Sequence, residues 1–519
     1  MLHPISPNDL YLLSPELSLT LLGLAVMMVD LFVKRRLVTV TVALVGLIIP
    51  AAFAISLALT LDPNVAHHAF FNMLVVDQYA IFFKIIFLII AAVMMLASYS
   101  YVGKYVKADG EFYTLMLFSV TGMMLMASTG ELISIYISLE LTSIPLYVMA
   151  GLIRANERSA EAAVKYVLLG AMSSAILLYG FALLYGLTGT TDLMGIATLI
   201  KSGIHSGNVI ISLQSNLMEL IAGILILAGF GFKISAVPFH MWAPDIYEGA
   251  PTAATAFFSV GSKAAGFAAL IRVFIDGGLG AVNLPSLVIA ISIVAILSMT
   301  LGNFVAAVQS NIKRMMAYSS IAQAGYILVG FTASLASNQS DGNAAVLFFI
   351  LVYVLTNLGA FAGIIALANA TGGERIEDFR GLGSRAPLLS LGTALCLLSL
   401  GGIPPMAGFI SKVFIFTAAW GQGQALINSG QSVVGHWLYV LVVVALINTI
   451  VSLVYYGRVV KAMYFDAPLK EDHLTTPLGL SSSIALTTAA LIVITFVAQL
   501  VLAAASPAAN SLLAFLLGR

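Results

Sequence analysis

The chain has 519 residues, of which 60% are hydrophobic and 9% are charged, and its mean hydropathy is +1.03. Soluble domains carry roughly 25% charged residues, so this composition predicts an integral membrane protein. The net charge of zero offers no basic field for nucleic acid and no acidic field for a cationic substrate. The single cysteine, Cys396, excludes a disulfide framework and any cysteine-ligated iron–sulfur or structural zinc site.

Apolar segments long enough to cross a bilayer follow one another along almost the whole chain. A transmembrane helix needs about 20 predominantly apolar residues, and this criterion predicts an all-α membrane protein with fourteen such helices. They are expected at residues 15–33, 37–59, 74–100, 111–129, 131–152, 160–187, 217–240, 252–276, 286–308, 313–333, 343–370, 387–418, 435–463 and 480–505. The first contains Glu16, which argues against a cleavable signal peptide.

Positively charged residues concentrate in the loops that follow odd-numbered helices. They are Lys34, Arg35, Arg36, Lys104, Lys107, Arg154, Arg158, Lys313, Arg314, Arg375, Arg380, Arg385, Arg458, Lys461 and Lys470. The loops after even-numbered helices hold almost none, with Lys201 as the clear exception. The positive-inside rule then predicts that both chain termini lie on the periplasmic or equivalent outer side of the membrane.

No soluble domain is expected between the helices. The longest loop, residues 188–216, is polar and rich in Gly and Ser, and it is too short for a core of its own. The stretches "GFGFK" and "GGLG" lie at membrane helices rather than in the strand–turn–helix setting that cradles phosphate. We therefore expect no nucleotide site and no nucleic-acid partner.

Ionisable side chains near the middle of the expected helices are few, and each is a candidate functional group. A charge at the bilayer centre costs at least about 2.5 to 3.5 kcal/mol on insertion scales, so such residues face protein or water and pair with something. The candidates are Glu140, Lys233, Lys263 and Lys412. The alternatives are a structural ion pair for the first three and helix packing for Lys412.

Three further residues have an interfacial alternative. Lys84 and Lys165 lie closer to the expected helix ends, where a four-carbon stem lets the ammonium group snorkel to the membrane surface. His240 follows an expected helix break and is compatible with an interfacial position or with a proton relay.

Two of the expected helices contain helix breakers close to a lysine. Pro238 lacks an amide hydrogen, so the carbonyl four residues earlier, beside Lys233, loses its helical partner. Pro404 and Pro405 interrupt the apolar run that continues to Lys412. Freed backbone at membrane depth persists only where protein or water satisfies it. One such break in each half of the chain predicts inverted repeats with an ion pathway between them.

Five stretches in this order closely resemble the antiporter-like membrane subunits of respiratory complex I, and specifically subunit N, called subunit 2 in mitochondria and plastids. They read "YISLELTSIPLYVM", "KISAVPFHMWAPDIYEGAPT", "FFSVGSKAAGFAAL", "RMMAYSSIAQAGY" and "GGIPPMAGFISKVF". The resemblance covers about residues 74–465.

This resemblance implies two inverted five-helix repeats, each with one broken helix. The implied divisions are N-terminal helices 1 to 3 in residues 1–110, a first repeat in 111–276, a second repeat in 286–463 and a C-terminal helix in 480–519. Glu140 and Lys233 would form an interacting pair. Lys165, Lys263 and Lys412 would follow along a hydrated central axis.

The implied activity is proton translocation by NADH:quinone oxidoreductase, a translocase. Burial disfavours a charged lysine and a nearby carboxylate favours it, so movement of Glu140 relative to Lys233 would change the protonation of that lysine. Coupled titrations would pass the change to Lys263 and Lys412. This chain would hold no cofactor or metal, and FMN, iron–sulfur clusters, NADH and quinone would bind elsewhere in the complex.

The resemblance also implies partners and a location. The partners would be the M-type, K-type and J-type membrane subunits, the peripheral arm and the lipid bilayer. The membrane would be the bacterial inner membrane, with a thylakoid or mitochondrial inner membrane as the alternative.

Three features favour subunit N over its siblings. L-type subunits continue into a long lateral helix, which is not expected here, and M-type subunits usually have glutamate where Lys412 stands. L, M and Mrp proteins carry His or Lys on helix 11, whereas "LFFILVYVLTNLGAF" has only Tyr353 as an ionisable side chain. The other polar groups of the second half, Thr356, Asn357, Ser319 and Gln323, would then only order water.

Two alternatives remain. The chain could be a subunit of an Mrp-type sodium/proton antiporter or of a membrane-bound hydrogenase, or it could be a purely structural membrane spacer.

Overall fold

The computed structural model describes residues 6–33, 35–63, 65–106, 109–202, 209–279, 284–336, 340–468 and 473–517. Lys34, Lys107 and Lys470 of the expected positive loops lie outside these residues, and the side chains of residues 201–216, Lys201 among them, are not described.

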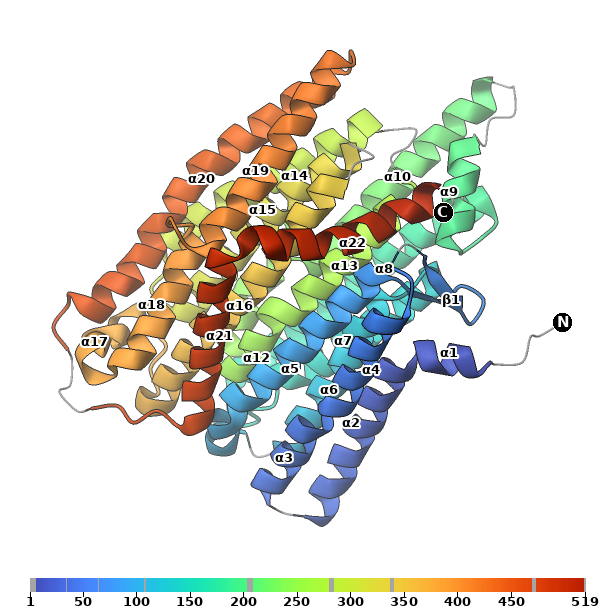
Figure 1. Ribbon diagram of the computed structural model, residues 1–519. Helices are drawn as coiled ribbons and strands as arrows, with labels where there is room; N and C mark the ends of the chain where they lie inside the picture. Colours follow the sequence, from blue (N-terminus) through green and yellow to red (C-terminus); the bar gives the residue numbers. More distant parts are fainter. Residues whose placement is uncertain are drawn as a thin grey trace.

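Helices make up most of the described chain, and the long ones run side by side as a bundle (Figure 1). They are α1 (Pro7–Leu12), α2 (Ser14–Phe32), α3 (Arg36–Gly46), α4 (Ile48–Thr60), α5 (Gln78–Tyr105), α6 (Asp109–Ala127), α7 (Leu132–Ala150), α8 (Glu157–Thr188), α9 (Leu193–Ser202), α10 (Val209–Lys233), α11 (Trp242–Gly249), α12 (Thr252–Phe257), α13 (Lys263–Ile275), α14 (Leu284–Val308), α15 (Ile312–Ala336), α16 (Ser340–Thr371), α17 (Leu382–Arg385), α18 (Pro387–Gly401), α19 (Ala407–Asn428), α20 (Ser432–Tyr464), α21 (Leu478–Phe496) and α22 (Ala498–Leu517). A π-helical turn, η1 (Phe258–Ser262), joins α12 to α13, and a 3-10 turn, η2 (Ile376–Phe379), precedes α17. β1 (His67–Ala69) and β2 (Leu74–Val76) form an antiparallel hairpin.

Twelve helical stretches of the described chain are long and apolar enough to cross a membrane. This confirms a mostly helical membrane fold, with twelve spans among the described residues where fourteen were expected. Two expected spans are not among these twelve: one overlaps α10, part of whose side chains are not described, and the other is divided by a break. The segment expected at 217–240 stops being helical after Lys233, and the segment expected at 387–418 is divided into α18 and α19.

Local sequence explains where several helices begin and end. The Asp77 side chain caps α5 by accepting a hydrogen bond from the Ala80 amide at 2.8 Å, and Asn156 caps α8 through the Arg158 amide at 3.0 Å. α8 ends at Gly189, whose φ of +71° lies in the left-handed region that glycine adopts without steric cost.

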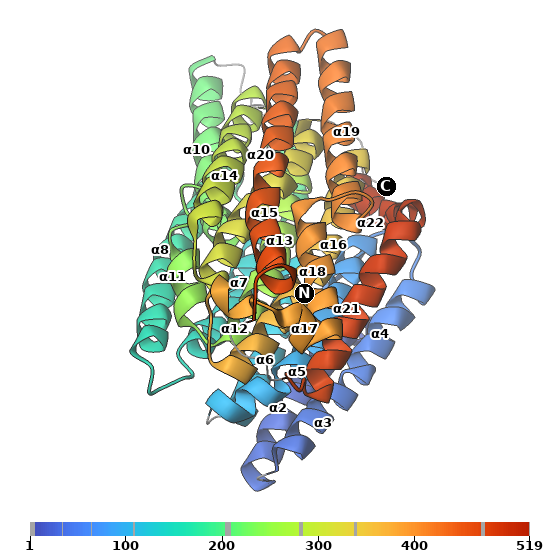
Figure 2. The same cartoon turned by 90° about the vertical axis from the view of Figure 1, so that its left-hand side faces the viewer.

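Two expectations about elements need correction. The expected last helix, residues 480–505, is divided at Phe496, and α22 then crosses the bundle instead of continuing along it. Figure 1 shows α22 running sideways over the bundle, and Figure 2 shows it nearly end-on; it packs against α5 and α16. The expected loop 188–216 holds the helix α9 and the start of α10, because its short apolar run "LMGIATLI" can form a turn or two of helix.

The helices differ strongly in how far they are enclosed by the others. All residues of the apolar window in Thr252–Ile275 are buried, as are 94% of those in α15 and in α16, against 28% for α2 and for Arg36–Thr60. The outer helices therefore present apolar faces to lipid or to partner subunits. The central helices α13, α15 and α16 are the most fully enclosed by their neighbours.

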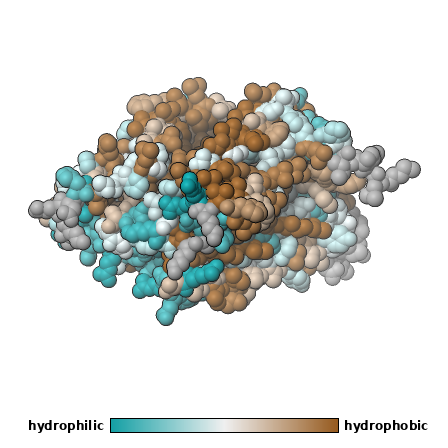
Figure 3. All heavy atoms as spheres, turned by 90° about the horizontal axis from the view of Figure 1, so that it is seen from below, coloured by the Kyte–Doolittle hydropathy of each residue, from teal (hydrophilic) through white to brown (hydrophobic). Residues whose placement is uncertain are grey.

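The loops with positive residues lie at one end of the tilted bundle, the lower side in Figure 1, where α2 ends and α3 begins at the bottom and where α20 ends at the left. An isolated β-bridge between Asn311 and Arg375 places two further such loops side by side at this end. Figure 3, which views the molecule from below, shows hydrophilic side chains gathered toward the left and centre of this face. The charge asymmetry read along the sequence is thus also an asymmetry in space.

Candidate functional site

The first break begins directly after Lys233. α10 ends at this residue, and residues 234–241 are not helical. Ser235 has a φ of +60°, a conformation that residues other than glycine rarely adopt and that is concentrated at functional sites. The break therefore begins four residues before Pro238 and includes it, because the chain leaves the helix at a left-handed residue.

Side chains from neighbouring segments satisfy the backbone that the break frees. The indole N–H of Trp242 donates to the Phe232 carbonyl at 2.8 Å, and the Val237 amide donates to Ser298 Oγ of α14 at 2.9 Å. This agrees with the rule that irregular backbone at membrane depth survives where protein groups bind it. The break is consequently a packed, fixed feature of the site.

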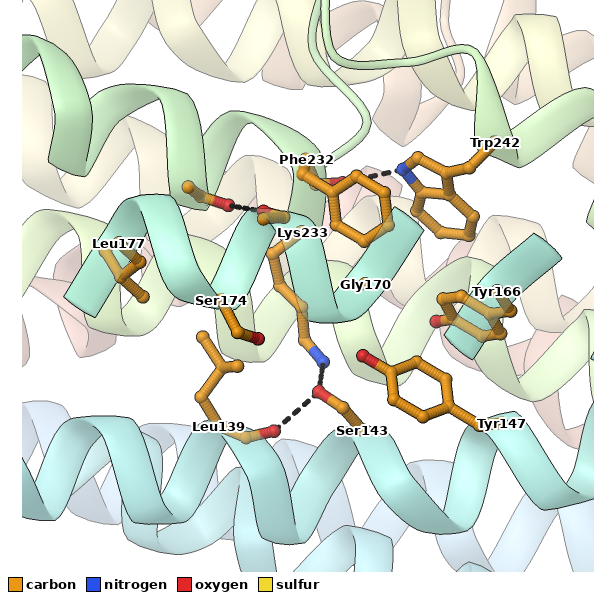
Figure 4. A pocket seen from close by; sticks show the side chains of 12 residues that line it. Leu139, Ser143, Tyr147, Tyr166, Gly170, Ser174, Leu177, Phe232, Lys233 and Trp242 are labelled. Atoms are coloured by element: carbon orange, nitrogen blue, oxygen red, sulfur yellow. Dashed lines mark hydrogen bonds between the residues drawn. The ribbon is translucent and has the colours of Figure 1, made fainter. Parts of the chain in front are cut away.

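Lys233 reaches from α10 across α8 to α7 (Figure 4). Its Nζ donates to Ser143 Oγ at 2.6 Å, and that hydroxyl donates to the Leu139 carbonyl at 2.6 Å. Lys233 is only 4% exposed. Beside it lies a cavity of about 10 Å³, lined also by Tyr147 and Ser174, which is about the size that holds one water molecule. The lysine thus has a hydroxyl as its direct partner and room for one further polar contact.

Glu140 lies near Lys233 without touching it. It stands one turn before Ser143 on α7 and is half-buried. It lines an open groove of about 760 Å³ between α7 and α8, together with Tyr136 and apolar residues that include Val164. No Glu140–Lys233 ion pair occurs among the described residues. The carboxylate therefore acts on the lysine through space, while Ser143 provides the direct contact.

Lys263 follows a local change in helix type. The turn η1 immediately before it is π-helical, a geometry that is rare and frequent at functional sites. The Tyr353 hydroxyl of α16 donates to the Ser259 carbonyl inside this turn at 2.8 Å. Lys263 is 2% exposed, and its Nζ donates to Ser320 Oγ of α15 at 2.7 Å. A second buried lysine thus also has a hydroxyl as its partner.

Lys412 stands against the second break. α18 ends at Gly401, and Lys412 Nζ donates to the freed carbonyls of Gly401 at 3.2 Å and Leu400 at 3.4 Å. A cation at a helix C-terminus also opposes the helix dipole. The ammonium lies 4.4 Å from the centre of the Tyr326 ring, within the range of a cation–π contact. The lysine and the break therefore interact directly here, whereas in the first half Trp242 takes over that role.

A network of hydroxyl and amide groups adjoins Lys412. Gln323 Nε2 donates to the Leu400 carbonyl at 3.0 Å, the same carbonyl that accepts from Lys412. Gln323 Nε2 also approaches the Tyr456 hydroxyl at 3.5 Å, and that hydroxyl is hydrogen-bonded to Ser319. A cavity of about 10 Å³ lined by Gln323, Lys412 and Tyr353 has room for one water molecule.

The same network continues through residues that the sequence analysis did not single out. Tyr455 donates to Asn303 Oδ1 at 3.0 Å, and Asn303 Nδ2 donates to the Tyr326 hydroxyl at 3.2 Å. A signal was present in the spacing. Ser319, Gln323 and Tyr326 recur at intervals of four and three residues on α15, which places them on one helix face.

Lys165 does not accompany the other three lysines. Its side chain is 40% exposed and pairs with Glu161 at 2.7 Å and with Asp245 at 2.8 Å. Arg314 binds the same Asp245 at 2.9 Å. Burial acts to raise the pKa of Asp245, but the hydrogen bonds from Lys165 and Arg314 outweigh it and hold the pKa below its usual value. Lys165 thus belongs to a charged surface network.

His240, the other candidate with an interfacial alternative, is half-buried in the first helix break.

Two other buried lysines are paired with carboxylates. Lys84 Nζ lies 2.8 Å from Glu16 Oε1, and both side chains are at most 2% exposed, so Lys84 does not snorkel to the surface. Lys313 Nζ lies 2.7 Å from Glu374 Oε1. These pairs differ in kind from Lys233, Lys263 and Lys412, whose hydrogen-bond partners are all neutral oxygen atoms.

The described parts of the chain contain no group of three or more His, Cys, Asp or Glu side chains that could hold a metal ion. The arrangement that the structure does contain is three buried lysines with neutral partners, two of which, Lys233 and Lys412, adjoin water-sized cavities. Such groups can exchange protons, because no direct carboxylate contact holds them in the charged state.

Known proteins resemble this chain over most of its length. A family model described as "NADH:quinone oxidoreductase/Mrp antiporter, TM" matches residues 129–438. The NADH-quinone oxidoreductase subunit N of Trichlorobacter lovleyi is 42% identical over 485 residues, which cover 91% of this chain and 92% of that relative.

Solved structures share the fold as well. A chain of respiratory complex I from Thermus thermophilus with bound aureothin superposes with a TM-score of 0.74 at 31% identity, covering 94% of this chain and 98% of that one. A chain of the Mrp complex from Dietzia sp. has a TM-score of 0.82 with coverages of 99% and 100%, but only 19% identity. That second likeness concerns the fold alone.

Proposed function

The chain belongs to the subunit N family of NADH-quinone oxidoreductases, and from this premise we propose that Glu140, Lys233, Lys263 and Lys412 form its proton relay. A protein of this family is an antiporter-like subunit in the membrane arm of complex I, a proton-translocating enzyme. The proposal concerns which side chains of this chain carry protons.

One observation carries the proposal: the three lysines are at most 4% exposed, yet each donates to a hydroxyl or carbonyl oxygen instead of a carboxylate. A buried lysine that is paired with a carboxylate is held in its charged form, and losing the proton would leave the carboxylate unpaired. A lysine with neutral partners leaves no such charge behind. It is therefore suited to repeated protonation and deprotonation.

The relay works by changes in electrostatic balance. Glu140 lies close enough to favour a charged Lys233 but makes no contact that would lock it. Ser143, one turn after Glu140 on α7, accepts the hydrogen bond from Lys233. A shift of α7 relative to α10 alters the distance between the carboxylate and the amine, and so the protonation of Lys233. Lys263 and Lys412 then respond as coupled sites.

The network beside Lys412 supplies the second half of the chain with polar groups of its own. Gln323, Ser319 and Tyr456 are joined by hydrogen bonds, and Tyr353 lines the cavity next to Lys412. In our proposal they hold water and conduct protons between Lys412 and the rest of the bundle. They take the place of the His or Lys that other antiporter-like subunits carry on the helix equivalent to α16. His240 remains a further relay candidate in the first half.

A direct test is replacement of Lys263 or Lys412 by alanine. Each variant should lower proton uptake by vesicles about tenfold or more, because the change removes a titrating group. NADH oxidation by an artificial acceptor at the peripheral arm should stay near the wild-type rate. Lys461→Ala is the control, since Lys461 is 69% exposed. Wild-type pumping by either buried variant, normalised to assembled complex, would refute the relay.

The same premise extends to the architecture. We propose fourteen crossings, counting the two broken helices, arranged as inverted repeats in residues 111–276 and 286–463 and flanked by segments 1–110 and 480–519. Both termini would lie on the outer side of a bacterial inner membrane. M-type, K-type and J-type subunits would be the neighbours, and FMN, iron–sulfur clusters, NADH and quinone would bind to other parts of the complex.

Cysteine labelling tests this orientation. Glu377→Cys should react with an impermeant thiol reagent only from the cytoplasmic side, and Val65→Cys only from the opposite side. Both positions are exposed, and the native Cys396 is fully buried, so its background reaction should be low. The reverse labelling pattern would invert every helix assignment proposed here.

A further inference from the structure

A buried triad of charges lies away from the lysines, at the end of the bundle that carries the β hairpin. Arg272, on the last turn of α13, places Nη2 2.8 Å from Asp77 Oδ1 and Nη1 3.0 Å from Asp276 Oδ2. All three side chains are at most 2% exposed. The Arg272 Nε–H donates to the Ala127 carbonyl at 3.1 Å. One guanidinium group thus faces two carboxyl groups at an almost fully buried site near this end of the bundle.

The charges of this triad do not balance if both carboxyl groups are ionised. Among the residues that the structure describes, the other titratable groups near it supply no second positive charge. Tyr79 on α5 donates its hydroxyl to the Ala268 carbonyl at 2.9 Å, and Asp192 before α9 adds only negative charge. Burial lowers the pKa of His68 on β1, so that imidazole is neutral at neutral pH. An unbalanced buried charge is costly, so one carboxyl group is expected to hold a proton.

The helix ends determine which carboxyl group this is. Asp77 caps the N-terminus of α5, where the helix dipole favours an anion, and its Oδ1 accepts from the Ala80 amide as well as from Arg272. Asp276 follows the last residue of α13, where the dipole disfavours an anion. Its Oδ1 is buried without a hydrogen-bond partner in the described part of the chain. Asp276 is therefore the better place for the proton.

We propose that Asp276 holds a proton at neutral pH and exchanges it with the solution at the hairpin end of the bundle as the complex turns over. The proton exchange by Asp276 rests on the proposed proton-translocating function, whereas the protonation of Asp276 at neutral pH does not. Burial raises the pKa of Asp276 to about 8, against the opposing effect of Arg272, which brings its titration near physiological pH. Lys263 is the first residue of α13, and Asp276 directly follows its last residue. At 1.5 Å per residue, the two lie about 20 Å apart along the helix axis.

Asp276→Asn tests the proposal in the purified complex, because the amide replaces a neutral carboxyl of the same shape. Wild-type enzyme at neutral pH should show an infrared carbonyl band of a protonated carboxyl group that the variant lacks, and this band should disappear as the pH rises through about 8. The variant should assemble at the wild-type level. Proton release by vesicles should fall about tenfold.

Asp192→Asn is the matched control, since Asp192 lies near the same hairpin and caps α9 through the Gly195 amide at 2.8 Å. It should keep both the band and normal proton release. Identical spectra for wild type and Asp276→Asn would show that Asp276 is ionised and overturn the proposal. Failure of Asp276→Asn to assemble would also overturn the proposal. The same holds if Asp276→Asn loses the infrared band but proton release is unchanged. The infrared result needs no turnover, so normal pumping by Lys263→Ala would overturn the relay alone.

Discussion

Lys233→Met is expected to slow proton-coupled quinone reduction about tenfold or more while the amount of assembled complex stays close to that of the wild type. The partner of Lys233 is the neutral Ser143 hydroxyl, which keeps its own hydrogen bond to Leu139. Removing the amine therefore leaves no direct ion-pair partner behind, and methionine fills much of the vacated space. The measurements are quinone-dependent activity and proton uptake in vesicles, both normalised to assembled complex.

Companion variants separate the contributions within this site. Ser143→Ala keeps the lysine and removes only its hydroxyl partner, so its effect should be smaller. Glu140→Gln should also slow pumping, because the carboxylate no longer favours the charged lysine. The double change of Glu140 to Gln and Lys233 to Met leaves nothing to titrate and should pump no better than Lys233→Met. Wild-type pumping by the double variant would mean that both residues are structural.

The opposite outcome is expected for Lys84→Met, which should destabilise the subunit by about 3 to 5 kcal/mol and sharply lower the amount of assembled complex. Lys84 Nζ lies 2.8 Å from Glu16 Oε1, and the two side chains are 0% and 2% exposed. Removing the ammonium leaves the carboxylate buried without its counter-charge, and the same pair ties α2 to α5. The measurements are the yield of assembled complex and its thermal midpoint.

A double variant tests the cause of this loss. Glu16→Gln combined with Lys84→Met removes both charges and should recover most of the assembly, because no unpaired ion remains. Activity per assembled complex should then match that of the wild type. If the double variant assembles normally but pumps slowly, the pair takes part in proton transfer and the structural interpretation is wrong. Together with the Lys233 series, this separates buried lysines that carry function from those that hold helices together.

Much of the fold was predictable because it depends on neighbours along the chain. Runs of apolar residues located most of the helices to within a few residues, and the loop charges correctly indicated one positive end of the bundle. Breaks were expected at Pro238 and at Pro404 with Pro405, and both helices are interrupted. The exact end of α10 was missed, since the left-handed conformation of Ser235 has no signature in that residue type. The crossing helix α22 was missed because its composition continues that of α21.

By itself, the amino-acid sequence determined the membrane environment, the helical fold and several of the ionisable residues within the membrane helices, since composition and periodicity are local properties. Only the tertiary structure decided which partner each of those residues meets. Lys84 and Lys233 are both single lysines in apolar helices, yet one meets Glu16 and the other meets Ser143. Their partners come from helices distant in the chain, and the partner's charge determines whether a buried lysine stays charged or exchanges its proton.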